Sequence, residues 1–201
     1  MDDPFHFAFD LDGTLTTAEI LPLIAAELGL REEMALLTHL TLNGLIPFEA
    51  SFRLRFEILR SVPLRRVQAI VAEVDVQPDL AAFIAGRPER CSVVTGNLDL
   101  WVKPLAAKLP CRWFSSRGAA GADGRVNLLE VLVKGRAVQA IKAGGGRLVA
   151  VGESRNDVSM FEEADVGVAF GGVHEPVAEL KAISDYVTYD ASVLCRLLST
   201  F

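Results

Sequence analysis

The alternation of short apolar runs with longer amphipathic stretches predicts an α/β chain. Residues 5–9 form an apolar run that reads as a buried strand. Further strands are expected at residues 91–95, 111–114, 148–151, 166–170 and 186–188, and helices at residues 78–86, 98–109, 134–143, 157–164, 175–182 and 191–199. Alternating strands and helices are typical of a doubly wound parallel sheet, a Rossmann-like arrangement with right-handed crossovers.

One long stretch interrupts this alternation directly after the first strand. It shows apolar residues at helical spacing and no convincing strand, and it predicts four short helices, at residues 18–30, 31–42, 47–60 and 64–73. We therefore expect two domains. Residues 1–15 and 76–201 would form the α/β core, and residues 16–75 would form a small helical cap inserted after the first strand.

Length, charge and cysteine content restrict the class of protein. A chain of 201 residues fits one α/β domain with a modest insertion, and a net charge of −6 argues against a nucleic-acid partner. The start lacks the basic segment of a signal peptide, and no apolar run approaches a membrane span. The three cysteines have no metal-ligand spacing and indicate a reducing compartment. We expect a cytoplasmic protein without nucleic-acid or membrane partners, and the sequence leaves its oligomeric state open.

Two carboxylates, Asp10 and Asp12, stand where the first strand ends. In an open parallel sheet, ligands bind in the crevice at the carboxyl ends of the strands. Carboxylates this close repel each other unless a cation lies between them, and Mg²⁺ is the obvious candidate because it prefers oxygen ligands. One carboxylate could attack phosphorus while the other transfers a proton. An acidic turn after a surface strand is the alternative, which the strongly apolar run before it disfavours.

The segment FDLDGTLT, residues 9–16, resembles the first motif of the haloacid dehalogenase-like hydrolases, Asp-x-Asp-x-Thr. That superfamily consists mostly of Mg²⁺-dependent phosphatases. The resemblance implies that Asp10 is a nucleophile that forms an aspartyl-phosphate. It also implies that Asp12 acts as general acid and base, and that Asp12 contributes its backbone carbonyl to the metal.

Two further segments fit the same superfamily. In VVTGN, residues 93–97, a strand ends in Thr95, Gly96 and Asn97, and a hydroxyl followed by glycine can bind a phosphate oxygen. The alternative is an ordinary turn in which Asn97 caps the next helix. Lys134 opens a predicted helix, where its charge opposes the helix dipole. Its charge could instead offset the carboxylates and bind the transferring phosphoryl group, or it could be a solvated surface lysine.

The segment GESRND, residues 152–157, follows the fourth motif of the superfamily. The resemblance makes Glu153 and Asp157 candidate metal ligands, and Asn156 a candidate to bind phosphate or orient a ligand. The commoner motif has aspartate where this chain has Glu153. Because Mg²⁺ demands near-octahedral geometry, this longer side chain must retract, bind through water or leave direct ligation to Asp157. We expect Mg²⁺, with Mn²⁺ as the alternative.

Two charged residues of the predicted cap, Glu19 and Arg55, suggest the kind of substrate. A carboxylate can accept from an ammonium group and a guanidinium can clamp a carboxylate, so together they suit an amino-acid zwitterion. The pair resembles the phosphoserine phosphatase branch, which has a glutamate at this distance from the nucleophile and a Phe-Glu…Arg-x-Arg helix in its cap. The resemblance implies a substrate pocket formed by Glu19, Phe48, Arg55, Gly96, Asn97 and Asn156. Arg53 is the rival to Arg55.

The sequence thus predicts a Mg²⁺-dependent phosphomonoester hydrolase for phosphoserine or a similar small phosphorylated amino acid. Other phosphometabolites, phosphoryl transfer to an alcohol, a phosphate-binding protein without turnover and a signalling receiver domain are the alternatives. Receivers are shorter and lack a helical cap.

Residues 115–127 read as a glycine-rich loop with room for a hairpin at Asp123 and Gly124. The three histidines, His174 among them, carry no functional signal.

Overall fold

A sheet of seven strands forms the centre of the protein, in the order β4-β3-β2-β1-β5-β6-β7. The computed structural model describes residues 5–121 and 125–201. The strands are β1 (Phe5–Phe9), β2 (Cys91–Leu98), β3 (Arg112–Ala120), β4 (Val126–Glu130), β5 (Arg147–Gly152), β6 (Val166–Phe170) and β7 (Tyr186–Thr188). All neighbouring strands pair in parallel except β3 and β4, which are antiparallel. The predicted α/β fold is confirmed.

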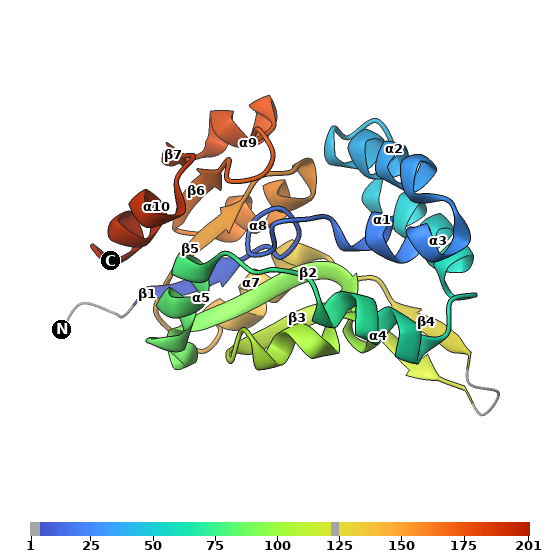
Figure 1. The fold of residues 1–201 in the computed structure, drawn as a ribbon. Coiled ribbons are helices and arrows are strands. Elements are labelled where there is room, and N and C mark those ends of the chain that lie inside the picture. Colours follow the sequence, from blue (N-terminus) through green and yellow to red (C-terminus); the bar gives the residue numbers. More distant parts are fainter. Residues whose placement is uncertain (1–4, 122–124) are drawn as a thin grey trace.

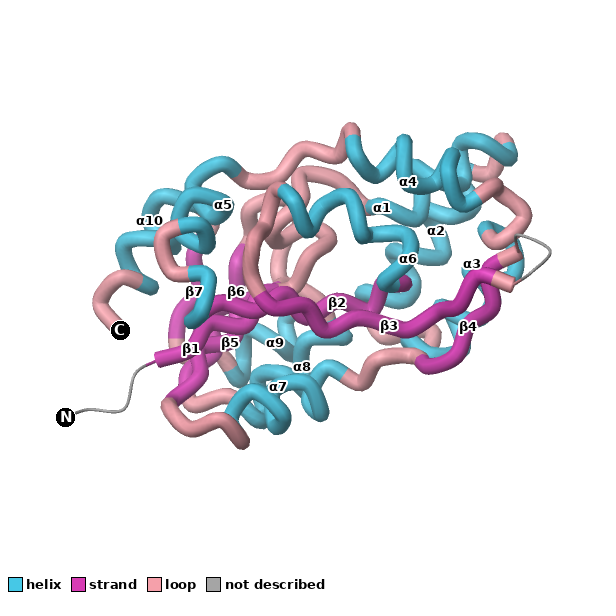
Figure 2. The backbone as a smooth tube through the Cα atoms, turned by 90° about the horizontal axis from the view of Figure 1, so that it is seen from below, coloured by secondary structure: helices cyan, strands magenta, loops and turns pink. Residues whose placement is uncertain are grey.

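Helices cover both faces of this sheet (Figures 1 and 2). One face packs against α5 (Pro78–Ala85) and α10 (Ala191–Leu198), and the other against α7 (Lys134–Lys142), α8 (Val158–Glu163) and α9 (Ala178–Ile183). The central strand β1 is continuously apolar because both of its faces are buried. Phe7 and Phe9 belong to the hydrophobic core on the side of α5 and α10, and Ala8 belongs to the core on the side of α7, α8 and α9, because successive strand residues point to opposite faces.

Four helices follow β1, namely α1 (Ile20–Ala25), α2 (Arg31–Leu42), α3 (Phe48–Leu59) and α4 (Leu64–Ala72). The first three lie together beside the sheet in Figure 1, whereas α4 contacts both α1 and the short helix α6 (Asp99–Val102). The two ends of this helical segment meet. Thr16 pairs with Val76 in an isolated bridge, and the N–H of Gln77 donates to the carbonyl of Leu15 at 2.8 Å. The division into core and cap stays a prediction, whose boundaries fall beside this bridge.

The loop predicted from residue 115 onward is wrong for its first part, because β3 continues to Ala120. The antiparallel pairing of β3 with β4 fits the hairpin that the sequence offered as the alternative. The extended chain is held by polar contacts that its sequence pattern does not indicate. The buried Ser116 hydroxyl donates to the carbonyl of Gly96 at 2.7 Å, and the N–H of Gly118 donates to Asp99 Oδ1 at 2.9 Å. The turn predicted at Asp123 and Gly124 lies outside the described residues.

Several helix ends also differ from the prediction. The helix expected at residues 98–109 is split into α6 and a 3-10 helix, Lys103–Ala107, which contains Pro104. Proline lacks an N–H donor and so interrupts the helical hydrogen bonds. Helix α9 begins at Ala178, after Pro176, and α1 ends at Ala25 with a 3-10 turn following it. Within residues 5–121 and 125–201, no helix has the length and apolar character needed to cross a membrane.

Gly135 provides a test of the contact between α7 and α8. A Cβ on this glycine would lie 2.8 Å from the backbone carbonyl oxygen of Ser159, which cannot move without shifting α8. We expect Gly135→Ala to lower the free energy of unfolding by about 1–3 kcal/mol, the usual range for an overpacked core. Urea denaturation of the wild-type protein and the variant measures this difference.

Gly86 is the matched control for this substitution. It has helical backbone angles, and the atoms nearest to an added Cβ are 3.6 Å away. Gly86→Ala should leave stability unchanged or raise it by up to about 1 kcal/mol, through the smaller entropy of the unfolded chain. Equal losses in both variants would contradict the packing argument.

Candidate active site

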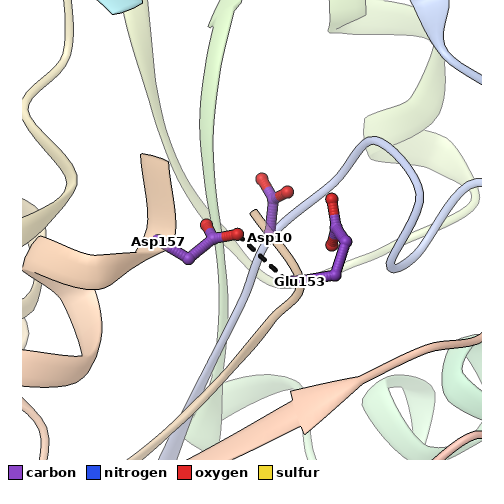
Figure 3. A group of neighbouring side chains, drawn as sticks. All are labelled: Asp10, Glu153 and Asp157. Carbon is purple, nitrogen blue, oxygen red and sulfur yellow. Dashed lines mark hydrogen bonds between the residues drawn. The ribbon is translucent and has the colours of Figure 1, made fainter. Parts of the chain in front are cut away.

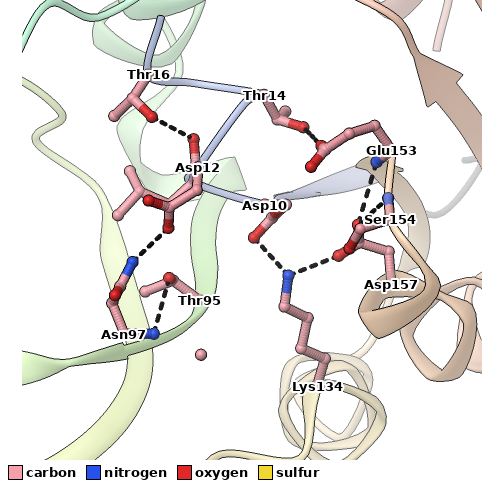
Figure 4. Close-up of polar contacts among 12 residues, drawn as sticks. Asp10, Asp12, Thr14, Thr16, Thr95, Asn97, Lys134, Glu153, Ser154 and Asp157 are labelled. Carbon is pink, nitrogen blue, oxygen red and sulfur yellow. Dashed lines mark hydrogen bonds and ion pairs between the residues drawn. The ribbon is translucent and has the colours of Figure 1, made fainter. Parts of the chain in front are cut away.

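Predicted site residues of the α/β core, among them Asp10, Lys134 and Glu153, come together at the carboxyl ends of the central strands (Figure 4). Strand β1 lies between β2 and β5, so the ends of these three parallel strands meet at one edge of the sheet. Asp10 follows β1, Thr95 lies near the end of β2, and Glu153 follows β5. This is the position at which open α/β sheets bind ligands.

Lys134, the first residue of α7, lies at the centre of the site with its side chain only 2% exposed. Its ammonium group donates to Oδ1 of Asp10 and, at 2.6 Å, to Oδ1 of Asp157. Burial by itself lowers the pKa of Lys134, but the two carboxylates raise it above its ordinary value. The lysine is therefore charged and buried, which excludes the alternative of a solvated surface side chain.

Three buried carboxylates lie together in this site (Figure 3). Asp10, Glu153 and Asp157 each place an oxygen within 4.8 Å of the other two. Burial and the charge of Asp157 raise the pKa of Asp10 to about 7, against the opposing effect of Lys134. Burial, Asp10 and Asp157 raise the pKa of Glu153 well above its ordinary value. One ammonium group does not balance three acids, so the group favours a further cation.

The hydrogen bonds of Asp157 occupy both of its carboxylate oxygens. Oδ1 pairs with Lys134, and Oδ2 accepts from the N–H of Glu153 at 3.1 Å and from the N–H and hydroxyl of Ser154, each at 2.9 Å. All three contacts of Oδ2 are local, and Ser154 and Asp157 form a capping box at the start of a 3-10 helix. Asp157 thus holds both the lysine and the loop that carries Glu153.

Glu153 has the opposite pattern, with one carboxylate oxygen available. Its Oε2 accepts from the Thr14 hydroxyl, whereas its Oε1 is buried without a hydrogen-bond partner among the described residues. Burying a carboxylate oxygen without a hydrogen-bond partner costs free energy on the order of several kcal/mol, because the group loses its hydration and gains nothing in return. A hard cation such as Mg²⁺ binds this type of oxygen, so the residues present fit such an ion.

Asp12 is half-buried and held by two donors. The N–H of Ile20, at the start of α1, donates to its Oδ1 at 2.9 Å, and the amide of Asn97 donates to its Oδ2. Burial, Glu19 and Asp10 raise the pKa of Asp12 well above its ordinary value, so this carboxyl group can carry a proton. Asn97 was expected to bind substrate, and its direct contact in the structure is with Asp12.

Helix α3 reaches the site through Phe48, which lies over Gly96. A Cβ on Gly96 would come within 2.1 Å of the Phe48 ring, so this close approach requires glycine. Phe48 in turn stacks on Phe52, with ring centroids 5.7 Å apart. Next to Gly96, the buried Thr95 hydroxyl accepts from the N–H of Asn97 at 3.1 Å.

One pocket joins these groups to the charged residues of the helical segment. Apart from Asp157, every predicted site residue lines it: Asp10, Asp12, Glu19, Phe48, Arg55, Thr95, Gly96, Asn97, Lys134, Glu153 and Asn156. Sequence reasoning omitted several other lining residues, among them Thr38, Thr41 and Ser154. The residue spacing gave no signal for Thr38 and Thr41, because their positions depend on how α2 packs.

The structure distinguishes between the two candidate arginines. Arg55 is 4% exposed, lines the pocket and donates to the Thr38 hydroxyl at 3.0 Å. Burial lowers the pKa of Arg55, and the carboxylates of Glu19 and Asp12 oppose this effect. Arg53 lies on the surface, where it pairs with Glu49 at 2.7 Å. Arg55 is therefore the arginine that can meet a ligand in this pocket.

His174 is a further residue that the sequence did not single out. It lies in the loop between β6 and α9, and its Nε2 is 3.1 Å from Oε1 of Glu19. The sequence separation of 155 residues explains why no local pattern indicated this contact.

Comparison with known proteins agrees with this geometry. The haloacid dehalogenase-like hydrolase family matches this chain over residues 7–162, and a second family with the same description matches over residues 133–192. The phosphoserine phosphatase of Methanocaldococcus jannaschii is 29% identical, over 87% of this chain and 88% of that protein. The phosphoserine phosphatase of Halobacterium salinarum is 31% identical, over 95% of each chain. Several other relatives are longer, and this chain spans about half of their length.

Solved structures show the same relationship. A structure described as a phospho-aspartyl intermediate analogue of phosphoserine phosphatase has a TM-score of 0.82 and 27% identity to this chain, and the alignment covers 98% of this chain and 99% of that one. The family match and these relatives together lead to one conclusion: this chain belongs to the haloacid dehalogenase-like hydrolases, in their phosphoserine phosphatase-like branch.

Proposed function

We propose that this phosphoric monoester hydrolase acts on phosphoserine through an aspartyl-phosphate on Asp10. The observation that carries the proposal is the shared pocket, in which the buried acids and Lys134 face the same space as Glu19 and Arg55. The first set suits phosphoryl transfer, and the second suits the ammonium and carboxylate groups of an amino acid. The similarity to named phosphoserine phosphatases supports the same substrate.

Asp10 would be the nucleophile. Its Oδ1 pairs with Lys134, so Oδ2 is the oxygen that would attack phosphorus. The attack forms a bond from Asp10 to phosphorus and breaks the bond from phosphorus to the serine oxygen. Lys134, the Thr95 hydroxyl and the N–H of Gly96 would hold the phosphoryl oxygens, where charge develops as the bond breaks.

Asp12 would transfer the protons. Its raised pKa lets it give a proton to the serine oxygen as that group leaves. The resulting carboxylate then takes a proton from water, whose oxygen attacks phosphorus, breaks the bond to Asp10 and releases inorganic phosphate. Asn97 and the N–H of Ile20 would keep Asp12 aimed at the leaving group through both steps.

Mg²⁺ would be held by Asp10, the backbone carbonyl of Asp12 and Glu153, with Mn²⁺ as the alternative ion. When bound, it supplies positive charge next to the buried carboxylates and the phosphate oxygens. Oε1 of Glu153 favours this residue as the direct ligand, because the two oxygens of Asp157 already have partners. We assign Asp157 to positioning Lys134.

The rest of the pocket would recognise the amino acid. Glu19 would accept hydrogen bonds from the ammonium group, and Arg55 would bind the carboxylate. Phe48 would cover the pocket beside Gly96, and Asn156 would contact the phosphate. The oligomeric state is open, and a cytoplasmic location stays a prediction.

The first test of this mechanism is Asp10→Asn. The amide keeps the shape of the side chain and is a far weaker nucleophile than a carboxylate, so phosphate release from phosphoserine with Mg²⁺ should fall to background. Circular dichroism and thermal unfolding should show a folded protein, because the amide still accepts a hydrogen bond from Lys134. A folded variant with more than a trace of turnover would contradict the nucleophile assignment.

The substrate assignment is tested by pairing Arg55→Ala with Arg53→Ala. On phosphoserine, Arg55→Ala should lower kcat/KM by about 100-fold, roughly the effect of losing a buried charge-assisted contact of about 3 kcal/mol. Arg53→Ala should change it less than about twofold, because Arg53 is an exposed partner of Glu49. Both variants should hydrolyse a small aryl phosphate like the wild type. Equal losses in the two variants would remove the argument for an amino-acid pocket.

The raised pKa of Asp10 predicts how stability depends on pH in the absence of metal. The ordinary value is 3.8 and the folded value is about 7, so between these limits the folded protein keeps a proton that the unfolded chain has lost. Stability therefore falls as pH rises from about 4 to 7 and then levels off. Urea denaturation with a chelator should show this decline in the wild type and a flatter profile in Asp10→Asn.

Mg²⁺ should oppose that decline, because the metal binds the ionised carboxylates. Its addition should stabilise the wild-type protein more at pH 8 than at pH 5 and should have a smaller effect on Asp10→Asn. Superimposable pH profiles for the two proteins would show that Asp10 does not titrate in this range.

A further inference from the structure

His174 connects the loop after β6 to Glu19, the residue directly before α1. The imidazole Nε2 lies 3.1 Å from Glu19 Oε1, which is a hydrogen-bond distance. The side chain of His174 is 41% exposed and that of Glu19 is 19% exposed. The pair therefore lies at the edge of the active-site pocket, with Glu19 on the inner side.

The imidazole also lies close to the turn that carries Asp10 and Asp12. Gly13 has φ +75°, and a Cβ on it would come within 3.0 Å of His174 Cδ2 and 3.2 Å of Glu153 Oε1. The absence of a side chain at Gly13 thus lets His174 approach this turn closely. His174 lines a neighbouring cavity that shares Glu19 and Thr38 with the active-site pocket, and it is not among the described residues lining the active-site pocket itself.

We propose that His174 is a positioning residue for Glu19 and thereby sets the preference of this enzyme for substrates that carry an ammonium group. The inference rests on the proposed function, in which Glu19 receives that ammonium. His174 engages Oε1 from outside the pocket, so Oε2 is the oxygen offered to the substrate. A glutamate side chain held in one rotamer loses less conformational entropy when the ligand binds, and preorganisation of this kind increases affinity.

The charges in the pocket support the same role. The hydrogen bond with Glu19 raises the pKa of His174, which favours the charged imidazolium beside that carboxylate. His174 contacts Glu19 from the more exposed side, and the residues lining the active-site pocket in the described part of the chain do not include it.

The test compares two substrates that differ at one group. Phosphoserine carries an ammonium where 3-phosphoglycerate carries a hydroxyl. In His174→Ala, KM for phosphoserine should rise about 5- to 20-fold while kcat stays within about twofold. For 3-phosphoglycerate, KM should not change. Where its turnover is too slow to measure, its inhibition constant against hydrolysis of an aryl phosphate should not change.

Three further variants separate positioning from a general structural effect. His39→Ala is the matched control, because His39 is an exposed histidine that lines the same neighbouring cavity. It should leave both substrates unaffected. His174→Gln keeps an N–H donor and should restore part of the phosphoserine affinity. In a Glu19→Ala background, His174→Ala should cause no additional loss, since the two residues act as one unit.

The outcomes distinguish this inference from the function on which it rests. Wild-type enzyme without activity on phosphoserine would overturn the proposed function and the inference together. Wild-type activity with an unchanged or lowered KM for phosphoserine in His174→Ala would overturn the role of His174 alone. Equal changes for both substrates, or additive losses in the double variant, would also overturn it, because they indicate a structural effect. Thermal unfolding confirms that each variant is folded.

Discussion

The site depends on the buried ion pairs between Lys134 and the two aspartates, Asp10 and Asp157. These residues come from the end of β1, the start of α7 and the loop after β5, so one ammonium group fixes three separate parts of the core. Removing one member of a buried ion pair leaves an uncompensated charge, and such losses are typically about 3–5 kcal/mol. Formation of these ion pairs therefore also brings the proposed nucleophile to its position.

The single ammonium group of Lys134 does not balance the carboxylates around it, and this imbalance gives the arrangement of Glu153 its importance. Oε1 of Glu153 has no hydrogen-bond partner among the described residues, while Oε2 is held by Thr14. The longer glutamate side chain is thus fixed at one oxygen and available at the other. We propose that this arrangement would let Glu153 bind the metal directly despite its additional methylene. It also separates the two acids of the GESRND segment, since Asp157 is occupied by Lys134 and the Ser154 loop.

The sequence predicted those parts of the structure that local patterns encode. The continuous apolar run of β1 and the motif residues after β1, within β2 and after β5 depend on short-range spacing, and the structure brings these motif residues to one pocket. Of the β3–β4 ribbon, the sequence predicted only the first strand residues and room for a hairpin, because its Ser-Ser-Arg-Gly segment lacks apolar alternation and is held by Ser116 and Asp99 instead. The contacts of Asn97 with Asp12 and of His174 with Glu19 arise only when distant segments pack, so no spacing could reveal them. The choice between Arg53 and Arg55 required the burial of α3 for the same reason.

Asp12 shows how strongly the chemistry is linked to the placement of the helical segment. One of its oxygens is held by the N–H of Ile20 in α1, and the other by Asn97 at the end of β2. A displacement of α1 relative to β2 would separate Asp12 from one of these two donors. The contact of Phe48 with Gly96 links α3 to the same strand, and the His174–Glu19 pair links the residue before α1 to the loop after β6. The packing of α1 against the strand ends therefore sets two positions: that of Asp12, which would transfer protons, and that of Glu19, which would bind the ammonium. Under the proposed mechanism, substrate selection and proton transfer would share one structural requirement in this protein.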